Sequence, residues 1–385
     1  MKNAMKNLLQ ILFVLVLLGS CISPDKKQSL EQERHIDTAV TIPSIFYINK
    51  LEEYEKKNID IHAIATQVDY IALETPENGL IPKSDTRVES ISIAGDNIFI
   101  VSLNKVFRFS RSGKFLNTIG AMGNGPQEYV TLIDVVINRN KEEVVFYDGG
   151  RQALIVYKYD GTFVRSVSLT SSWGIRVGII NDSTLCAVSV PSQSTPGFFL
   201  LSLKDGRMIK ALSPVYSSRS GIKSLILGFM SSPRVNDGRV FFNSMISDTI
   251  FSIDEIALEP RYIQLPPNVR VKDRDPENCS NPHLIFETDF YANIIIFGDT
   301  PPAKSYLIDK RENLIYRGGL RDELCGARLI QLINTGEKNE VATLYQAYWL
   351  KEQLDSGALV GDTLKYIAQN MKEDDNPVVM IAKLP

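Results

Sequence analysis

The residues that could do chemistry in this sequence are aromatic, arginine and carboxylate side chains between predicted strands. They recur in six such segments: Gln127, Glu128 and Tyr129; Asp148 and Arg151; Trp173 and Arg176; Tyr216 and Arg219; Asp248; and Arg321 with Asp322. An aromatic ring can stack on a sugar, and the planar guanidinium of arginine matches the oxygens of a carboxylate. We therefore predict that these residues contribute to a ligand-binding surface, although polar loop residues are also commonly solvated or structural.

Residue sets that would indicate a reaction or a metal are weaker. His35, His62 and His283 show no metal-ligand spacing, and the chain contains no Gly-x-Ser-x-Gly nucleophile elbow. The sequence therefore identifies no catalytic residue, no metal ligand and no cofactor. A calcium ion held in a central channel by carbonyl and carboxylate oxygens stays open as an alternative.

Gly120, Gly123 and Gly125 form a glycine-rich stretch that could suggest a phosphate-binding loop. Such a loop needs a helix N-terminus directly after it, and the P-loop also carries Lys-Ser or Lys-Thr. Here Pro126 and a predicted strand follow instead. We interpret the glycines as a crossing between two structural repeats.

The repeats are defined by short apolar strands that flank a polar turn with glycine. Gly113, Gly161 and Gly206 occupy equivalent turns and are 48 and 45 residues apart. This period, with strand and hairpin signals and no helix between them, is typical of a β-propeller. We predict an all-β, six-bladed propeller of four-stranded antiparallel blades.

The predicted strands can be assigned blade by blade. Blade one comprises 87–94, 97–102, 106–110 and 114–119; blade two 130–137, 143–147, 153–158 and 162–169; blade three lies within 175–212; blade four has a first strand within 222–230, then 239–243, 248–253 and 258–265; blade five has 291–297, 304–309 and 314–317 after a long connection at 266–282; blade six has 329–334, 340–344 and 377–383.

Blade six lacks one strand. Upstream of blade one, residues 67–74 form a predicted strand of alternating apolar and polar residues that has no partner. We expect this strand to pair with 377–383 and to close the ring, which removes the free sheet edges. Helix-like patterns at 346–354 and 362–372 predict a short helical insertion within blade six.

The N-terminus reads as an export signal. Lys2 and Lys6 precede an apolar run at 8–18 that is too short for a permanent membrane span. The run ends in Leu-Gly-Ser-Cys at 18–21, which resembles a bacterial lipobox and implies a signal peptide at 1–20 and acylation of Cys21. A polar tether at 21–41 and a single domain at 42–385 would follow. The lipid anchor would hold the protein at a membrane, and we favour the outer membrane over the inner membrane.

Composition limits the choice of partners. A formal net charge of −3 provides no basic surface of the kind that nucleic acid requires. Besides Cys21 the chain has Cys186, Cys279 and Cys325, too few for a disulfide framework. Cys279 with Cys325 is the pair we would expect if one forms, and buried or free thiols are the alternative.

The stretch 109–129, FSRSGKFLNTIGAMGNGPQEY, resembles the signature of six-bladed β-propeller lipoproteins of Gram-negative anaerobes, a group related to NHL-repeat propellers. The lipobox, the strand at 70–74 and the terminal strand at 374–381 extend the resemblance over most of the chain. It implies the fold and an envelope location, and it transfers no catalytic residue.

We expect a membrane-anchored envelope propeller that binds a ligand, a glycan or an envelope protein through one face, without catalysis. Two alternatives stay open. One is a metal-assisted lyase or hydrolase acting on glycans or lactones, and the other is a structural subunit of an envelope complex.

Overall fold

The structure is a computed structural model, and its described residues all belong to one compact unit within Ile42–Pro385. They are 44–49, 53–82, 90–170, 176–189, 196–212, 233–236, 238–243, 248–254, 257–265, 281–297 and 303–385. The predicted signal peptide, Cys21 and the tether lie outside the described residues. Within the described part, no helix is both long and apolar enough to span a membrane.

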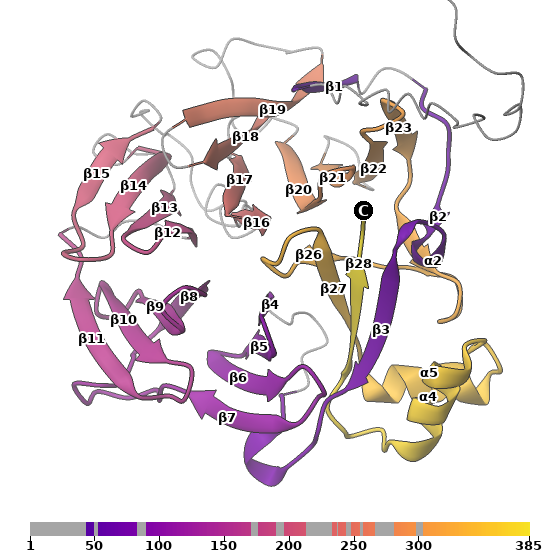
Figure 1. Cartoon of the computed structure of the whole chain (residues 1–385), viewed down its shortest axis with the longest axis horizontal. Coiled ribbons are helices and arrows are strands. Elements are labelled where there is room, and N and C mark those ends of the chain that lie inside the picture. Colours follow the sequence, from indigo (N-terminus) through magenta and orange to yellow (C-terminus); the bar gives the residue numbers. More distant parts are fainter. Residues whose placement is uncertain are drawn as a thin grey trace, which may run out of the picture. The chain divides into compact units, whose positions relative to one another are not determined.

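Six sheets, each built on four antiparallel strands, surround a central axis (Figure 1) and confirm the predicted propeller. Blades one to three are β4 (Ser90–Ala94), β5 (Asn97–Ser102), β6 (Lys105–Ser110) and β7 (Phe115–Ile119); β8 (Leu132–Asn138), β9 (Glu143–Asp148), β10 (Ala153–Lys158) and β11 (Phe163–Ser168); and β12 (Arg176–Asn181), β13 (Thr184–Val188), β14 (Phe198–Ser202) and β15 (Met208–Ala211).

Blades four to six follow the same plan. They are β16 (Arg234–Asn236), β17 (Arg239–Asn243), β18 (Thr249–Asp254) and β19 (Ala257–Leu265); β20 (Asn281–Glu287), β21 (Tyr291–Phe297), β22 (Lys304–Asp309) and β23 (Leu314–Arg317); and β26 (Ile333–Asn334), β27 (Glu340–Tyr345), β28 (Val378–Lys383) and β3 (Gln67–Ala72). The first strand of each blade is innermost.

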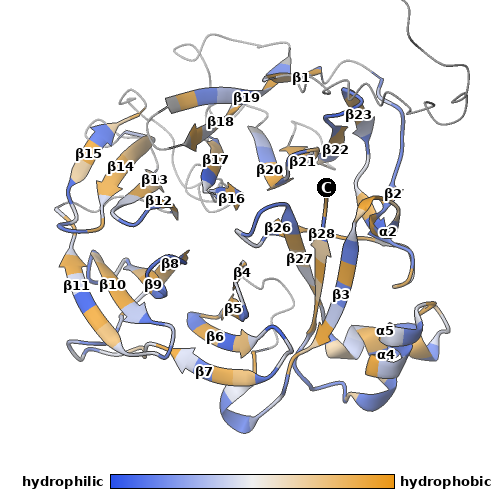
Figure 2. Ribbon diagram, in the orientation of Figure 1, coloured by the Kyte–Doolittle hydropathy of each residue, from blue (hydrophilic) through white to orange (hydrophobic). Residues whose placement is uncertain are grey.

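The burial of each strand follows from its place in the blade. The middle strands β9 and β10 are buried along almost their whole length, because their two faces pack against the neighbouring blades. The outer strands β7 and β11 alternate between partly buried and exposed residues. Apolar residues accordingly concentrate on the strands, and polar ones on the turns (Figure 2). The core is therefore a set of seams between blades.

The ring closes as predicted, because β3 pairs with β28 over six residues, from Gln67 opposite Lys383 to Ala72 opposite Val378. Asn376, which precedes β28, secures the chain just beyond β3. Its side chain accepts a hydrogen bond from the Ile81 N–H (2.8 Å) and donates to the carbonyls of Glu74 (2.7 Å) and Gly79 (2.9 Å). The N- and C-terminal segments of the propeller therefore meet in blade six.

The repeated glycine turns hold neighbouring blades together. Gly113 has a φ of +89°, and an added Cβ would lie 2.2 Å from the Ala72 carbonyl oxygen at the end of β3. Gly206 has a φ of +69°, and its Cβ would lie 2.3 Å from the Ser168 carbonyl oxygen at the end of β11. Only glycine combines this backbone conformation with so close an approach. The periodic signal in the sequence therefore marks contacts between blades.

The chain before β3 follows the outer edges of blades four and five and then pairs with a strand between blades five and six. β1 (Phe46–Asn49) pairs in parallel with β19 of blade four, and Lys56 forms a parallel bridge to Arg317 of blade five. β2 (Ile59–Asp60) then pairs in parallel with β24 (Leu320–Asp322), which in turn pairs with β25 (Arg328–Leu329). The short helix α2 (Ile61–Ile64) leads into β3. This edge segment, residues 46–64, was not predicted from the sequence.

Three predicted strand positions need correction. The strand predicted at 329–334 is divided, because β25 pairs with β24 and only β26 at Ile333–Asn334 belongs to blade six. The first strand of blade four is β16 at Arg234–Asn236, and not within 222–230, which lie outside the described residues. Three residues are too few to show a period. Blade five begins with β20, which was missed because Pro282 and His283 interrupt its apolar pattern. Blade six confirms the helical insertion, with α4 (Ala347–Asp355) and α5 (Asp362–Asn370) between β27 and β28.

The cysteines can be placed in part. Cys186 on β13 and Cys325 after β24 are both fully buried, and burial raises the pKa of the Cys186 thiol to about 12. Cys279 lies outside the described residues, so its pairing with Cys325 stays a prediction.

Asn376 provides a test of ring closure. Asn376→Ala should lower the free energy of unfolding by about 2–4 kcal/mol, because two buried backbone groups, at Gly79 and Ile81, and the partly buried Glu74 carbonyl lose their partner. Denaturant unfolding of the full chain in detergent measures the change. Asn370→Ala, at an exposed position of α5, is the control and should change stability by less than about 0.5 kcal/mol. Equal effects of the two variants would contradict the closing role of Asn376.

Candidate functional site

The central channel holds a group of charged side chains from several blades. Inner strands β4, β8, β12, β16 and β26, with adjoining residues, line a narrow cavity of about 90 Å³. Its charged lining residues are Asp134, Arg139, Arg176 and Arg234. This volume accommodates a few water molecules or one small charged group of a larger ligand.

Asp134 and Arg176 come from neighbouring inner strands, β8 and β12. The closest approach of the carboxylate to the guanidinium is 3.7 Å. Asp134 also accepts hydrogen bonds from the backbone N–H groups of Val177 (2.8 Å) and Val135 (2.9 Å), and Arg176 donates to the Ile133 carbonyl (2.9 Å). Burial raises the pKa of Asp134, and the positive charge of Arg176 opposes that rise. The pair is thus positioned mainly by backbone contacts between blades two and three.

Arg234, the first residue of β16, adds a second positive charge to the same cavity. Its Nε donates to the Leu284 carbonyl at 3.4 Å. Burial and, to a smaller extent, the positive charge of Arg176 lower the pKa of Arg234 to about 10, and the charge of Asp134 opposes this shift. Two guanidinium groups therefore lie near the Asp134 carboxylate in a poorly hydrated space. The positive charge of both arginines disfavours the calcium ion considered above.

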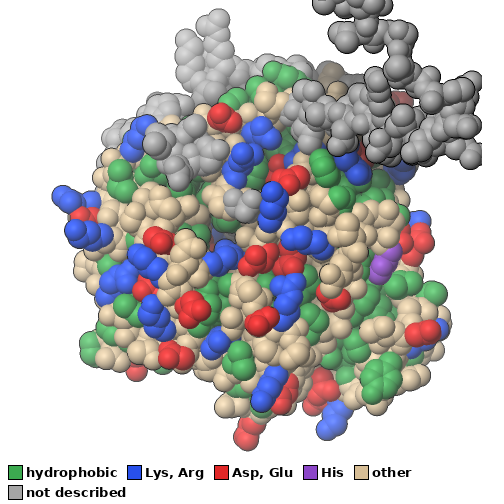
Figure 3. All heavy atoms as spheres, in the orientation of Figure 1, with side chains coloured by type: hydrophobic (Ala, Val, Ile, Leu, Met, Phe, Trp, Pro, Cys, Tyr) green, Lys and Arg blue, Asp and Glu red, His purple; other side chains and the backbone are tan. Residues whose placement is uncertain are grey.

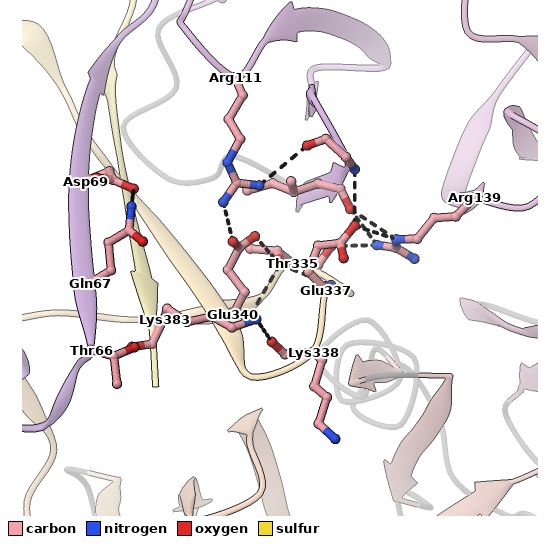
Figure 4. A network of polar contacts seen from close by, with 12 residues as sticks. Thr66, Gln67, Asp69, Arg111, Arg139, Thr335, Glu337, Lys338, Glu340 and Lys383 are labelled. Atoms are coloured by element: carbon pink, nitrogen blue, oxygen red, sulfur yellow. Dashed lines mark hydrogen bonds and ion pairs between the residues drawn. The ribbon is translucent and has the colours of Figure 1, made fainter. Parts of the chain in front are cut away.

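At the other end of β8, Arg139 is bound within a polar network that joins three blades (Figure 4). It donates to the carbonyls of Ile93 (2.8 Å) and Thr335 (2.8 Å) and lies 3.5 Å from Glu337. Nearby, Arg111 pairs with Glu340. Charged side chains gather around the middle of the face seen in Figure 3. Carbonyls and carboxylates satisfy Arg139, so its role is structural.

The glycine-rich crossing between β7 and β8 is stabilised by its own predicted site residues. The Glu128 carboxylate accepts a hydrogen bond from the Gly125 N–H (2.7 Å) and would clash with any Cβ at Gly123. Tyr129 is buried and donates to the Asn104 carbonyl, and Gln127 is exposed, with its carbonyl accepting from Tyr157 at 2.7 Å. None of the three lines the described channel cavity.

Asp148 and Arg151 reinforce the same crossing. Asp148 is fully buried, and its carboxylate accepts from the backbone N–H groups of Val130, Thr131 and Gly150, each at 2.9 Å. Arg151 donates to the carbonyl of Gly125 at 2.6 Å. These bonds occupy both side chains, so we leave them out of the proposed site.

The remaining predicted residues are dispersed. Among the predicted site residues that the structure describes, only Arg176 lines the channel cavity. Asp248 precedes β18, where its carboxylate accepts from the Thr249 hydroxyl (2.9 Å), and Arg321 lies on β24 and pairs with Glu323. Trp173, Tyr216 and Arg219 lie outside the described residues, so their roles stay predictions.

Sequence reasoning missed Asp134 and Arg234. A signal for Asp134 was present, because it is a charged residue inside the otherwise apolar strand LIDVVIN. Arg234 lies in a three-residue strand that has no recognisable period.

Comparison with known proteins agrees with the fold. The family model described as "Domain of unknown function (DUF4934)" matches residues 45–383. A Bacteroides fragilis NCTC 9343 protein whose name describes it as exported is 15% identical, with a TM-score of 0.68 over 89% of this chain and 99% of that chain. A DUF4221 family member from Bacteroides vulgatus is 9% identical, with a TM-score of 0.45 over 83% and 96% of the two chains.

No curated protein matches the sequence. At these identities the likeness to the Bacteroides fragilis protein concerns the fold alone. The family model, in contrast, spans nearly the whole propeller. The chain therefore belongs to the family described as "Domain of unknown function (DUF4934)".

Proposed function

We propose that this chain is a lipid-anchored envelope propeller that binds an anionic group of a glycan or envelope protein in its central channel. The observation that carries the proposal is the placement of Arg176 and Arg234 beside the Asp134 carboxylate in the channel cavity. Burial of the Arg234 guanidinium is costly, as the lowered pKa of this residue indicates, and a bound anion would reduce that cost. Paired guanidinium groups suit carboxylate, sulfate or phosphate oxygens.

The size of the cavity narrows the kind of ligand. About 90 Å³ holds a carboxylate or sulfate group but not a whole sugar ring. The ligand would insert this anionic group into the channel, and the rest of the ligand would lie across the face of the propeller. The exported relative fits an envelope location, and the lipobox-like sequence ending at Cys21 supports anchoring.

Arg234→Met tests the anion site. Sulfate affinity of the full chain in detergent should fall at least tenfold, measured by calorimetry, because one of the two guanidinium groups is removed. Stability without sulfate should stay the same or rise, since a desolvated charge is lost. Arg207→Met, at an exposed arginine paired with Asp205, is the control and should keep the wild-type affinity. The same loss in both variants would refute the site, because it would show that sulfate affinity depends on surface charge in general and not on the channel arginine.

The pH dependence gives a second test. The raised pKa of Asp134 means that its ionised form is penalised in the folded protein, so this cost is relieved as the pH falls through that pKa. Protonation also removes the negative charge of Asp134 beside Arg176 and Arg234, so sulfate affinity should rise from about pH 7 to about pH 4. Asp134→Asn should flatten this dependence. A wild-type affinity that is constant over the range would contradict the mechanism.

Anchoring is tested separately. Cys21→Ala should shift the chain from the membrane fraction to the soluble or unprocessed fraction and abolish labelling by a fatty-acid analogue, because the acylated residue is lost. Cys186→Ala removes a buried thiol within the propeller and should leave both readouts unchanged. Membrane association that survives Cys21→Ala would exclude the lipid anchor.

A further inference from the structure

A second group of potential ligand atoms lies away from the channel, where the edge segment reaches blade six. Asp60 ends β2, His62 lies in α2, and Asp322 ends β24. The parallel pairing of β2 with β24 brings these residues together, although His62 and Asp322 are 260 residues apart in sequence. One donor atom from each lies within 4.8 Å of the other two.

Asp322 is held in a fixed orientation. It is fully buried, and its Oδ2 accepts hydrogen bonds from the hydroxyls of Tyr70 (2.7 Å) and Tyr345 (2.8 Å). Burial and the negative charge of Asp322 raise the pKa of both tyrosines, so they remain protonated donors. Oδ1 accepts from the Leu324 N–H at 3.0 Å and lies 3.3 Å from His62 Nε2. Oδ1 therefore faces the imidazole.

His62 and Asp60 complete the group from the accessible side. The His62 side chain is 26% exposed, and its Nε2 also lies 2.9 Å from the Tyr70 hydroxyl. Asp60 is partly exposed and occupies the N-cap position of α2, yet its carboxylate makes no capping bond. Its Oδ1 accepts instead from the Glu323 N–H at 3.2 Å. Both side chains can therefore adjust to a ligand while Asp322 stays fixed.

A groove beside the cluster provides access. His62 and Tyr70 line an open cavity of about 620 Å³, together with Leu324 and Thr363 at the start of α5. A metal site that does more than stabilise the fold needs such an entry path and room for a water or ligand oxygen.

We propose that Asp60, His62 and Asp322 bind a first-row divalent transition metal ion, with Zn²⁺ as the probe. One imidazole nitrogen and two carboxylates suit zinc, and the imidazole disfavours Ca²⁺ and Mg²⁺, which prefer oxygen ligands alone. Zinc bonds of about 2.0–2.1 Å place tetrahedral ligand atoms about 3.3 Å apart, which is the observed separation of His62 Nε2 and Asp322 Oδ1. The two tyrosines act as the supporting shell that orients Asp322.

This site is independent of the anion proposed for the channel. It lies at the outer edge of blade six, and its ion would present an open position to the groove. Lewis acidity there could bind an oxygen of a second ligand or of a water molecule.

The experiment measures Zn²⁺ binding to the full chain in detergent by calorimetry, after removal of metal with EDTA. Wild type should bind one ion that His62→Gln and Asp60→Asn each weaken by at least about tenfold, because each loses a ligand. Asp69→Asn is the matched control, since Asp69 lines the same groove and accepts a hydrogen bond from Gln67 without joining the cluster. It should bind Zn²⁺ as wild type does. Ca²⁺ should bind far more weakly than Zn²⁺.

The other outcomes overturn the proposal. Absence of Zn²⁺ binding in wild type, or equal affinity in wild type, His62→Gln and Asp60→Asn, would exclude this site. If the variants have a lower melting temperature in EDTA but unchanged Zn²⁺ affinity, the cluster has a purely structural role. If His62→Gln fails to unfold cooperatively, the Zn²⁺ affinity of Asp60→Asn decides. Arg234→Met should leave Zn²⁺ binding unchanged, which keeps this result separate from that of the channel.

Discussion

The pairing of β3 with β28 is the contact on which the ring depends. It joins segments that lie far apart in the chain, with Thr66 and Lys383 separated by 317 residues. Closing a loop of that length costs about 5 kcal/mol of chain entropy, with a slow dependence on length. A six-residue ladder, the buried residues Val379 and Ile381, and the triple hydrogen bonding of Asn376 offset this cost together. Blade six therefore contains strands from both the N-terminal and the C-terminal part of the propeller, and its stability requires both strands, β3 and β28.

Closure also explains why charge collects on the axis. Each blade contributes its innermost strand to a channel too narrow for bulk water, and several of these strands carry a charged residue at or near their start. On β8, β12 and β16 those residues are Asp134, Arg176 and Arg234. At the opposite end of β8, Arg139 meets carbonyls and Glu337 and is fully satisfied. The two ends of β8 thus differ in their surroundings, and the end with Asp134 is the one where we propose that an anion binds.

The sequence predicted the architecture well because the fold is periodic. Gly113 and Gly206 recur where one blade touches the outer strand of the preceding one, so a local rule for turns also reports a contact between blades. The period fails where an element is short, as in β16, or contains proline, as in β20. Of the candidate site, Arg176 was found, because it starts a regular strand. Asp134 and Arg234 share a cavity through ring geometry that sequence spacing does not express.

The cluster at Asp60, His62 and Asp322 was beyond sequence reasoning for the same reason, and it also bears on closure. Asp60 and His62 belong to the segment that leads directly into β3, whereas Asp322 belongs to the chain between blades five and six. Tyr70 on β3 and Tyr345 on β27 meet at the Asp322 carboxylate, so this residue already ties the closing strand to the blade it completes. A metal ion bound there would add a cross-link between α2 and β24. It would stabilise the ring where the edge segment joins it, because an ion that binds only the folded arrangement shifts the unfolding equilibrium toward the closed propeller.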